Sequence, residues 1–148
     1  MITIRTFLRS EDGTFLPVEE QVQPLSDSDY IEGAIEMNIN GTEIIGRSEW
    51  DYVDQLWSYL ASMVHSLRSE ERAETHFPDQ PVLLEFERLG RDLRISCRSG
   101  DVVRQARTSE SELLDTLASA GRSFFANMSR LVPANAGSYR LAESMLRR

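Results

Sequence analysis

The sequence predicts one α+β domain, in which a single mostly antiparallel sheet of about six strands carries two long helices on one face and a short C-terminal helix. Three observations lead to this fold class. Short segments of alternating apolar and polar residues are separated by turn residues, two longer segments repeat apolar residues every three or four positions, and 148 residues suit one domain of ordinary size. The domain is expected to span 1–148.

The first two strands are expected to form a hairpin. Residues 2–8 alternate like a strand, and the Asp-Gly pair that follows them is frequent in tight turns. The return strand is expected over 14–18, where Pro17 lacks a backbone donor and therefore places the segment at a sheet edge. A long, acidic loop interrupted by a proline is expected over 19–29.

A second hairpin has the strongest local signal in the chain. Residues 30–39 alternate between apolar and polar side chains, which indicates a strand with one wet face. Asn40-Gly41 follows, and both residue types tolerate the positive φ of a type I′ turn. The partner strand is therefore expected over 42–45.

The segment 48–67 holds both tryptophans and is expected to be a core helix. Trp50 and Trp57 belong to a stripe of apolar residues three or four positions apart. Ser48 is expected to be the N-cap, with Asp51 in the first turn, where free N–H groups favour a carboxylate. The polar side chains expected on the solvated face are Asp51, Asp54, Gln55, Ser58 and Ser62.

An antiparallel meander of three strands is expected after this helix. Residues 69–75 are expected to be exposed, and the Phe-Pro-Asp-Gln-Pro run at 77–81 is a rigid connector because each proline fixes its own φ. The strands are expected over 82–88, 93–98 and 102–107. Charged residues on their outer face can pair across strands.

Two helices are expected to complete the chain. Ser109 and Glu112 have the spacing of a capping box and precede a helical repeat of apolar residues that continues to Leu131. Pro133 ends this helix, and a short basic helix is expected over 138–148.

Charge is distributed unevenly along the chain. The net charge is −8, and all 16 basic residues are arginines, which is typical of a GC-rich bacterial genome. Residues 1–80 carry a net charge of −11 and residues 81–148 a net charge of +3. Such a surface repels phosphates, which argues against a nucleic acid or an anionic membrane as partner and favours a basic protein. The alternative is that the charge only keeps the protein soluble. The residues predicted to contact a partner are Glu19, Glu20, Asp27, Asp29, Glu32 and Glu36.

The sequence also predicts a cytoplasmic protein. It contains no apolar run of 18 residues that could span a bilayer, and its N-terminus lacks the features of a signal peptide. The single cysteine, Cys97, alternates with apolar residues and is expected to pack as a small hydrophobic side chain.

No pattern in the sequence indicates a catalytic, cofactor or metal site. His65 and His76 are 11 residues apart and lack the spacing of metal ligands, so His65 is expected to pack on the helix flank and His76 to lie on the surface. Nucleophile elbows, phosphate-binding loops and dinucleotide-binding glycine motifs are absent from the sequence. We therefore expect no catalytic residue, no cofactor and no metal.

The chain also has two resemblances to known proteins. The first rests on a glycine, two tryptophans, an aspartate and a leucine that precede the proline-rich connector: Gly46, Trp50, Asp51, Leu56, Trp57 and 77–81. In these residues the chain resembles small uncharacterised bacterial proteins from high-GC genomes. In size, acidity and α+β layout it is also similar to immunity proteins of polymorphic toxin systems, which bind and block a cognate toxin. That class has no shared motif, so the resemblance implies no site residue.

These observations favour a non-enzymatic binding module, of which an immunity-type inhibitor is one form. Two alternatives stay open. A small-molecule-binding or enzymatic domain would have its pocket between the sheet and the helices, and a structural subunit would form a homo-oligomer through its last helix.

Overall fold

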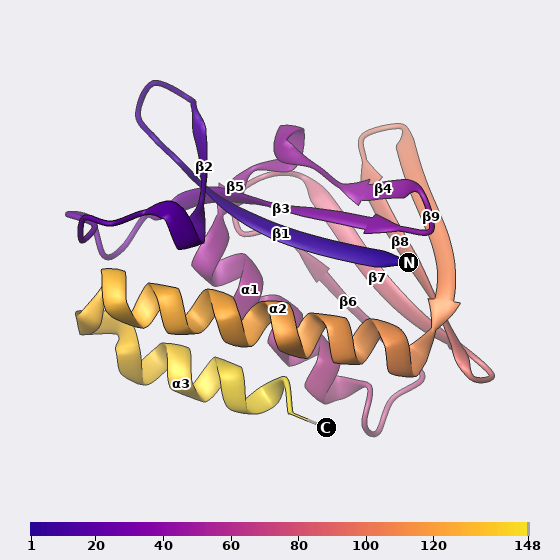
Figure 1. The fold of residues 1–148 in the computed structure, drawn as a ribbon. Coiled ribbons are helices and arrows are strands. Elements are labelled where there is room, and N and C mark those ends of the chain that lie inside the picture. Colours follow the sequence, from indigo (N-terminus) through magenta and orange to yellow (C-terminus); the bar gives the residue numbers. More distant parts are fainter. Residues whose placement is uncertain (148) are drawn as a thin grey trace.

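The computed structural model describes residues 1–147 and confirms the α+β class, but it contains two antiparallel sheets where the sequence predicted one (Figure 1). The chain forms two successive sets of strands, each followed by a long helix. Strands pair only within their own set, because short hairpins connect them and the first helix then separates the two sets.

The first sheet has the strand order β2-β1-β3-β4, and β5 also pairs with β3. Its strands are β1 (Ile2–Arg9), β2 (Phe15–Pro17), β3 (Glu32–Ile39), β4 (Thr42–Ile45) and β5 (Asp51–Tyr52). Asn40 and Gly41 connect β3 to β4 with φ of 50° and 88°, which confirms the predicted turn. The predicted edge position of Pro17 is also confirmed, because β2 pairs only with β1.

The second sheet is a meander with the order β6-β7-β8-β9. Its strands are β6 (Arg72–His76), β7 (Val82–Leu89), β8 (Asp92–Ser99) and β9 (Val102–Ser109). The last three confirm the predicted meander. The predicted exposure of 69–75 is confirmed for most of these residues but is wrong for Ala73, which is buried, and the prediction missed that β6 pairs with β7. This strand is polar because only alternate residues face the core, so it has little apolar signal.

Edge strands of the two sheets, β4 and β9, pack against each other. Two side-chain contacts link β9 to the part of the chain around the first sheet, one to η2 (Arg47–Glu49) and one to the β3–β4 turn. The guanidinium of Arg104 lies 2.9 Å from the carboxylate of Glu49, and the amide of Asn40 donates to the carbonyl oxygen of Arg107 at 3.3 Å. The strands β4 and β9 lie side by side but are not paired by backbone hydrogen bonds, so the strands form two sheets. The sequence shows where strands occur but not which strands pair, and this is why it predicted a single sheet.

The three helices pack together and against the two sheets (Figure 1). They are α1 (Val53–Ser66), α2 (Glu110–Leu131) and α3 (Ala136–Met145), and the short 3₁₀ turns are η1 (Val18–Glu20), η2 (Arg47–Glu49) and η3 (Pro133–Asn135). The helix α2 runs along β1, α1 contacts β6, and α3 packs against both longer helices. The hydroxyl of Ser109 accepts a hydrogen bond from the Glu112 N–H at 3.2 Å and so caps α2 as predicted.

Trp57 lies at the centre of the core, as predicted, and its side chain is 0 % exposed. Its indole N–H donates to the hydroxyl of Thr6 at 3.0 Å, and its ring stacks on Phe124 with centroids 5.8 Å apart. Phe125 meets the indole edge-on at 6.4 Å. On α2, a Cβ at Gly121 would lie 3.0 Å from the indole, so glycine lets the helix approach this ring.

The first long helix begins at Val53 and not at the predicted Ser48. The intervening residues form η2 and then β5, which pairs with the start of β3. Trp50 is therefore outside the helix and only half-buried, and the Arg9 guanidinium lies 4.0 Å from the centroid of its ring. The apolar repeat continues N-terminal to Val53, and for this reason the sequence predicted a helix that starts five residues too early.

Two acidic residues predicted to be solvated are buried. Asp51 is 2 % exposed, and its carboxylate accepts hydrogen bonds from the backbone N–H groups of Asp79 and Gln80, at 2.8 to 3.1 Å. Asp54 is 9 % exposed and accepts a hydrogen bond from the hydroxyl of Tyr139 at 2.9 Å. The first carboxylate anchors the proline-rich connector, and the second ties α3 to α1.

Replacing Asp54 by asparagine should change how stability depends on pH. Burial raises the pKa of the Asp54 carboxyl above its ordinary value of 3.8, and the hydrogen bond from Tyr139 only partly opposes this. The folded state therefore keeps this proton to higher pH than the unfolded state, and stability falls as pH rises from 3.8 through the raised value. Urea unfolding of both proteins across pH 3 to 8 should show the variant gaining stability relative to the wild type over that window; a constant difference would contradict this account.

The structure also tests the remaining predictions about single residues. Cys97 is buried, as predicted, and burial raises the pKa of its thiol to about 11. His76 is exposed as predicted, whereas His65 is exposed and does not pack on the helix flank. On the outer face of the meander, Arg94 pairs with Glu87 at 2.6 Å, which confirms the predicted cross-strand charge pairing.

Candidate protein-binding groove

A cavity of about 730 Å³ lies between the β1–β2 hairpin and the segment 21–31. We call it the acidic groove. Its lining residues are Leu8, Arg9, Ser10, Glu11, Thr14, Phe15, Leu16, Gln21, Leu25, Ser26, Asp27, Tyr30, Ile31 and Glu32. The hairpin contributes one wall and the loop that the sequence predicted as acidic contributes the other.

The groove has an apolar base with larger apolar side chains at its margin. Leu8 and Ile31 are buried in the core beneath it, and Leu25 packs partly against the same core. Leu16 on β2 is 40 % exposed and Tyr30 at the end of the loop is 64 % exposed. Both side chains line the same hollow, and exposed apolar surface of this kind is one mark of a contact surface for another protein.

Carboxylates surround this apolar base. Glu11 and Asp27 line the groove from opposite walls, and Glu32 lines it from β3. Glu32 is paired with Arg9, whose Nη1 lies 3.0 Å from its Oε1, and Arg9 also stacks over Trp50. Arg9 therefore offsets one of the three carboxylates, and the rim stays negative.

The tip of the hairpin adds a further stable negative charge. Asp12 accepts hydrogen bonds from the backbone N–H and the hydroxyl of Thr14, at 3.1 and 2.8 Å, and another from the hydroxyl of Ser10. These bonds stabilise the carboxylate and lower the pKa of Asp12 from 3.8 to about 2. The tip is thus ionised at any pH at which the groove could bind a basic group.

The segment 21–31 is held in place by the C-terminal end of α2 and by η3. The N–H of Leu25 donates to the carbonyl of Leu131 at 3.1 Å, and the amide of Asn135 donates to the carbonyl of Ser28 at 2.8 Å. Within the loop, the Asp27 carboxylate accepts the N–H groups of Asp29 and Tyr30. The groove wall is therefore organised before any partner arrives.

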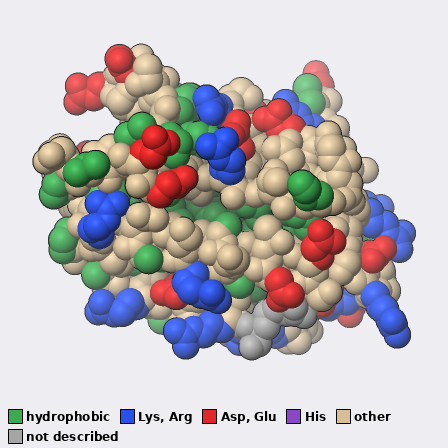
Figure 2. Space-filling model, viewed as in Figure 1, with side chains coloured by type: hydrophobic (Ala, Val, Ile, Leu, Met, Phe, Trp, Pro, Cys, Tyr) green, Lys and Arg blue, Asp and Glu red, His purple; other side chains and the backbone are tan. Residues whose placement is uncertain are grey.

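The structure brings together some of the predicted contact residues and separates others. Asp27 and Glu32 line the groove. Glu19 and Glu20 are exposed in η1, next to the groove residue Gln21, and Asp29 is exposed two residues beyond Asp27. In Figure 2 acidic side chains gather around the hairpin and this end of the first sheet.

Glu36 lies apart from the other predicted contact residues. It lies four residues beyond Glu32 in β3, on the outer face of the sheet, and pairs with Arg47 at 3.3 Å. Sequence reasoning missed Glu11, Leu16 and Tyr30. Of these three, only Tyr30 had a signal in the sequence: it is an aromatic residue on the solvent-facing side of an alternating strand, where such a side chain is unusual.

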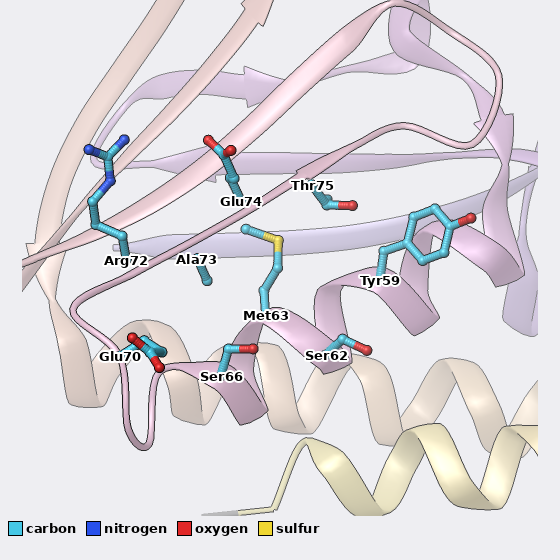
Figure 3. A pocket seen from close by; sticks show the side chains of 9 residues that line it. All are labelled: Tyr59, Ser62, Met63, Ser66, Glu70, Arg72, Ala73, Glu74 and Thr75. Carbon is cyan, nitrogen blue, oxygen red and sulfur yellow. The ribbon is translucent and has the colours of Figure 1, made fainter.

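A second hollow, of about 370 Å³, lies between α1 and β6 (Figure 3). Tyr59 and Met63 of α1 point toward the strand, whereas the side chains of Arg72 and Glu74 point away from the helix. Arg72 instead pairs with Glu85 of the neighbouring strand. This hollow lies where the alternative of a pocket between sheet and helices placed one. Its lining carries hydroxyls, a thioether, and the carboxylates of Glu70 and Glu74.

Within residues 1–147, no three His, Cys, Asp or Glu side chains form a group that could hold a metal ion. None of the helices in that part of the chain combines the length and the apolar character needed to cross a bilayer.

The acidic groove is the larger of the two hollows, with about 730 Å³ against about 370 Å³. Comparison of the chain with protein-family models, with curated proteins and with solved structures finds no match.

Proposed function

We propose that this protein is a non-enzymatic cytoplasmic binding module that holds a basic segment of a partner protein in the acidic groove, as an immunity-type inhibitor would hold a toxin. One observation carries this proposal. A hollow of about 730 Å³ combines an apolar base, two exposed apolar side chains and an acidic rim in one place.

Charge around the groove would guide the partner toward it. Residues 8–32 contain seven carboxylates and a single arginine, so this segment accounts for −6 of the net charge of −8. A concentrated negative surface raises the rate at which a basic protein meets the site, and salt weakens this effect. The acidic rim therefore supports fast, salt-dependent association.

Short-range contacts would then hold the partner. Tyr30 is an exposed ring beside Tyr52, with centroids 5.5 Å apart, so one tyrosine is positioned by the other. An arginine of the partner can lie over the face of Tyr30 while an apolar neighbour contacts Leu16 and the groove base. Because the loop is already tied to α2 and η3, little ordering entropy is lost on binding.

The experiment compares two variants of equal net charge. In the groove variant, Glu11, Glu19 and Glu20 become glutamine and Asp29 becomes asparagine. In the control variant, Glu43, Glu70 and Glu74 become glutamine and Asp101 becomes asparagine. All eight side chains are exposed, so neither variant should lose thermal stability.

Association is measured by stopped flow at two ionic strengths with a partner isolated by affinity capture. We expect the groove variant to associate about tenfold more slowly at low salt, and the control variant to stay within about twofold of the wild type. Tyr30→Ala should instead mainly speed dissociation, because it removes a packed contact. If the two charge variants associate at equal rates, the carboxylates around the groove have no role in binding and the proposal fails.

A further inference from the structure

One edge of β1 is unpaired over most of its length. On one side β1 pairs with β3 from Ile2 to Leu8. On the other side β2 pairs only with Phe7 to Arg9. Over 2–6, no strand of the described chain covers this second edge.

The direction of the backbone groups along this edge follows from the hairpin. In an antiparallel ladder, successive residues direct their N–H and C=O groups alternately to the two sides of the strand. The N–H of Ser10 donates to the carbonyl of Thr14 across the hairpin, so the even-numbered residues face the β2 side. The backbone groups of Ile2, Ile4 and Thr6 therefore point to the open edge and can accept another strand.

The space beside this edge is a hollow of about 620 Å³ between β1 and α2. Ile2 and Ile4 line it from the strand, and Thr116, Ser119 and Ser123 line it from the helix. Figure 2 shows hydrophobic side chains along the band between the first sheet and the long helix. The helix residues that line the hollow have small side chains, and a strand added to this edge would lie about 4.8 Å from β1.

We propose that a second copy of this chain occupies the hollow, with the two β1 strands antiparallel and a twofold axis at Ile4. This register pairs Ile4 with Ile4 and Ile2 with Thr6 of the second copy. All of these are even-numbered residues, so both strands direct their unpaired N–H and C=O groups at each other. The open stretch 2–6 is centred on Ile4, and the two first sheets join into one continuous sheet.

Charge favours a second copy over a basic partner at this edge. The hollow is lined by one arginine, Arg5, and one aspartate, Asp115, so its net charge is zero on a protein with a net charge of −8. Two copies can therefore meet through this face without bringing a net charge from either hollow together, and nothing here selects a basic segment as the acidic groove does. In the proposed register Arg5 lies opposite Thr3 of the second copy, so no like charges meet.

Sedimentation velocity of the full chain, up to about 0.2 mM, tests this proposal. We expect a monomer–dimer equilibrium in the wild type and a monomer in Ile4→Pro. That proline removes an N–H which points to the open edge and makes no bond to β3, so the variant should still fold. Leu141→Ser, on the exposed face of α3, should leave the dimer unchanged.

A second measurement covers the case in which Ile4→Pro does not fold. The register places Thr3 opposite Arg5 of the second copy in a non-hydrogen-bonded pair, with Cα atoms about 4.5 Å apart, a separation that a disulfide can bridge. The double variant Thr3→Cys, Arg5→Cys should form a covalent dimer on oxidation with copper–phenanthroline, and Thr3→Cys alone should not. A wild type that stays monomeric at 0.2 mM, a dimer lost through Leu141→Ser, or a double variant that does not cross-link would each overturn the proposal.

Discussion

Replacing Trp57 by alanine is expected to lower the free energy of unfolding by about 3 to 5 kcal/mol, the range for truncating a large aromatic side chain in a core. The indole is wholly buried between Thr6, Phe124 and Phe125. Its removal leaves a cavity and also leaves the Thr6 hydroxyl without its donor. Because helices and sheet all meet this ring, the surroundings cannot collapse far enough to refill the space.

Trp50→Ala is the matched control for this prediction. Trp50 is only half-buried, and its ring contacts the guanidinium of Arg9, so its truncation should cost about 1 kcal/mol. Urea unfolding monitored by circular dichroism measures both variants without relying on tryptophan fluorescence. Equal losses of stability in the two variants would mean that Trp57 is not the centre of the core.

Replacing Asp51 by alanine is expected to cost about 2 to 3 kcal/mol, because a buried carboxylate that accepts several backbone hydrogen bonds is removed. The N–H groups of Asp79 and Gln80 would lose their acceptor, and the connector 77–81 would lose its attachment to β5. The loss should be accompanied by faster hydrogen exchange at these two amides, since they would open to solvent.

Asp51→Asn separates the hydrogen bonds from the charge. The amide oxygen still accepts one backbone N–H, so this variant should lose less stability than Asp51→Ala and should keep part of the exchange protection at Asp79 and Gln80. Equilibrium unfolding and amide exchange by NMR measure both effects. Unchanged protection in Asp51→Ala would show that other groups hold the connector.

Much of the local structure follows from neighbouring residues. Asn40-Gly41 has the positive φ values that its turn type requires, and Ser109 caps α2 because its hydroxyl lies three residues before a free N–H. The meander and the burial of Trp57 follow from apolar periods of two and of three to four residues. Each of these features depends on residues close together in the chain.

The candidate groove could be predicted only in part. The acidic loop was visible in the sequence, and Asp27 and Glu32 do line the groove. Glu11 and Leu16 reach it from the hairpin, which folds back against the loop only in three dimensions. Glu36 had the same sequence signal as Glu32, but its place further along β3 separates it from the groove.

The sequence by itself therefore determined the α+β class, the hairpins, the cap of α2 and the residue at the centre of the core. Only the tertiary structure decided that there are two sheets, that 72–76 is a strand, that α1 starts at Val53, and that Asp51 and Asp54 are buried. The physical reason is the range of the interactions. Asp51 is buried because it binds a connector 28 residues away, and β6 is a strand because β7 pairs with it, and neither fact leaves a periodic trace in the local sequence.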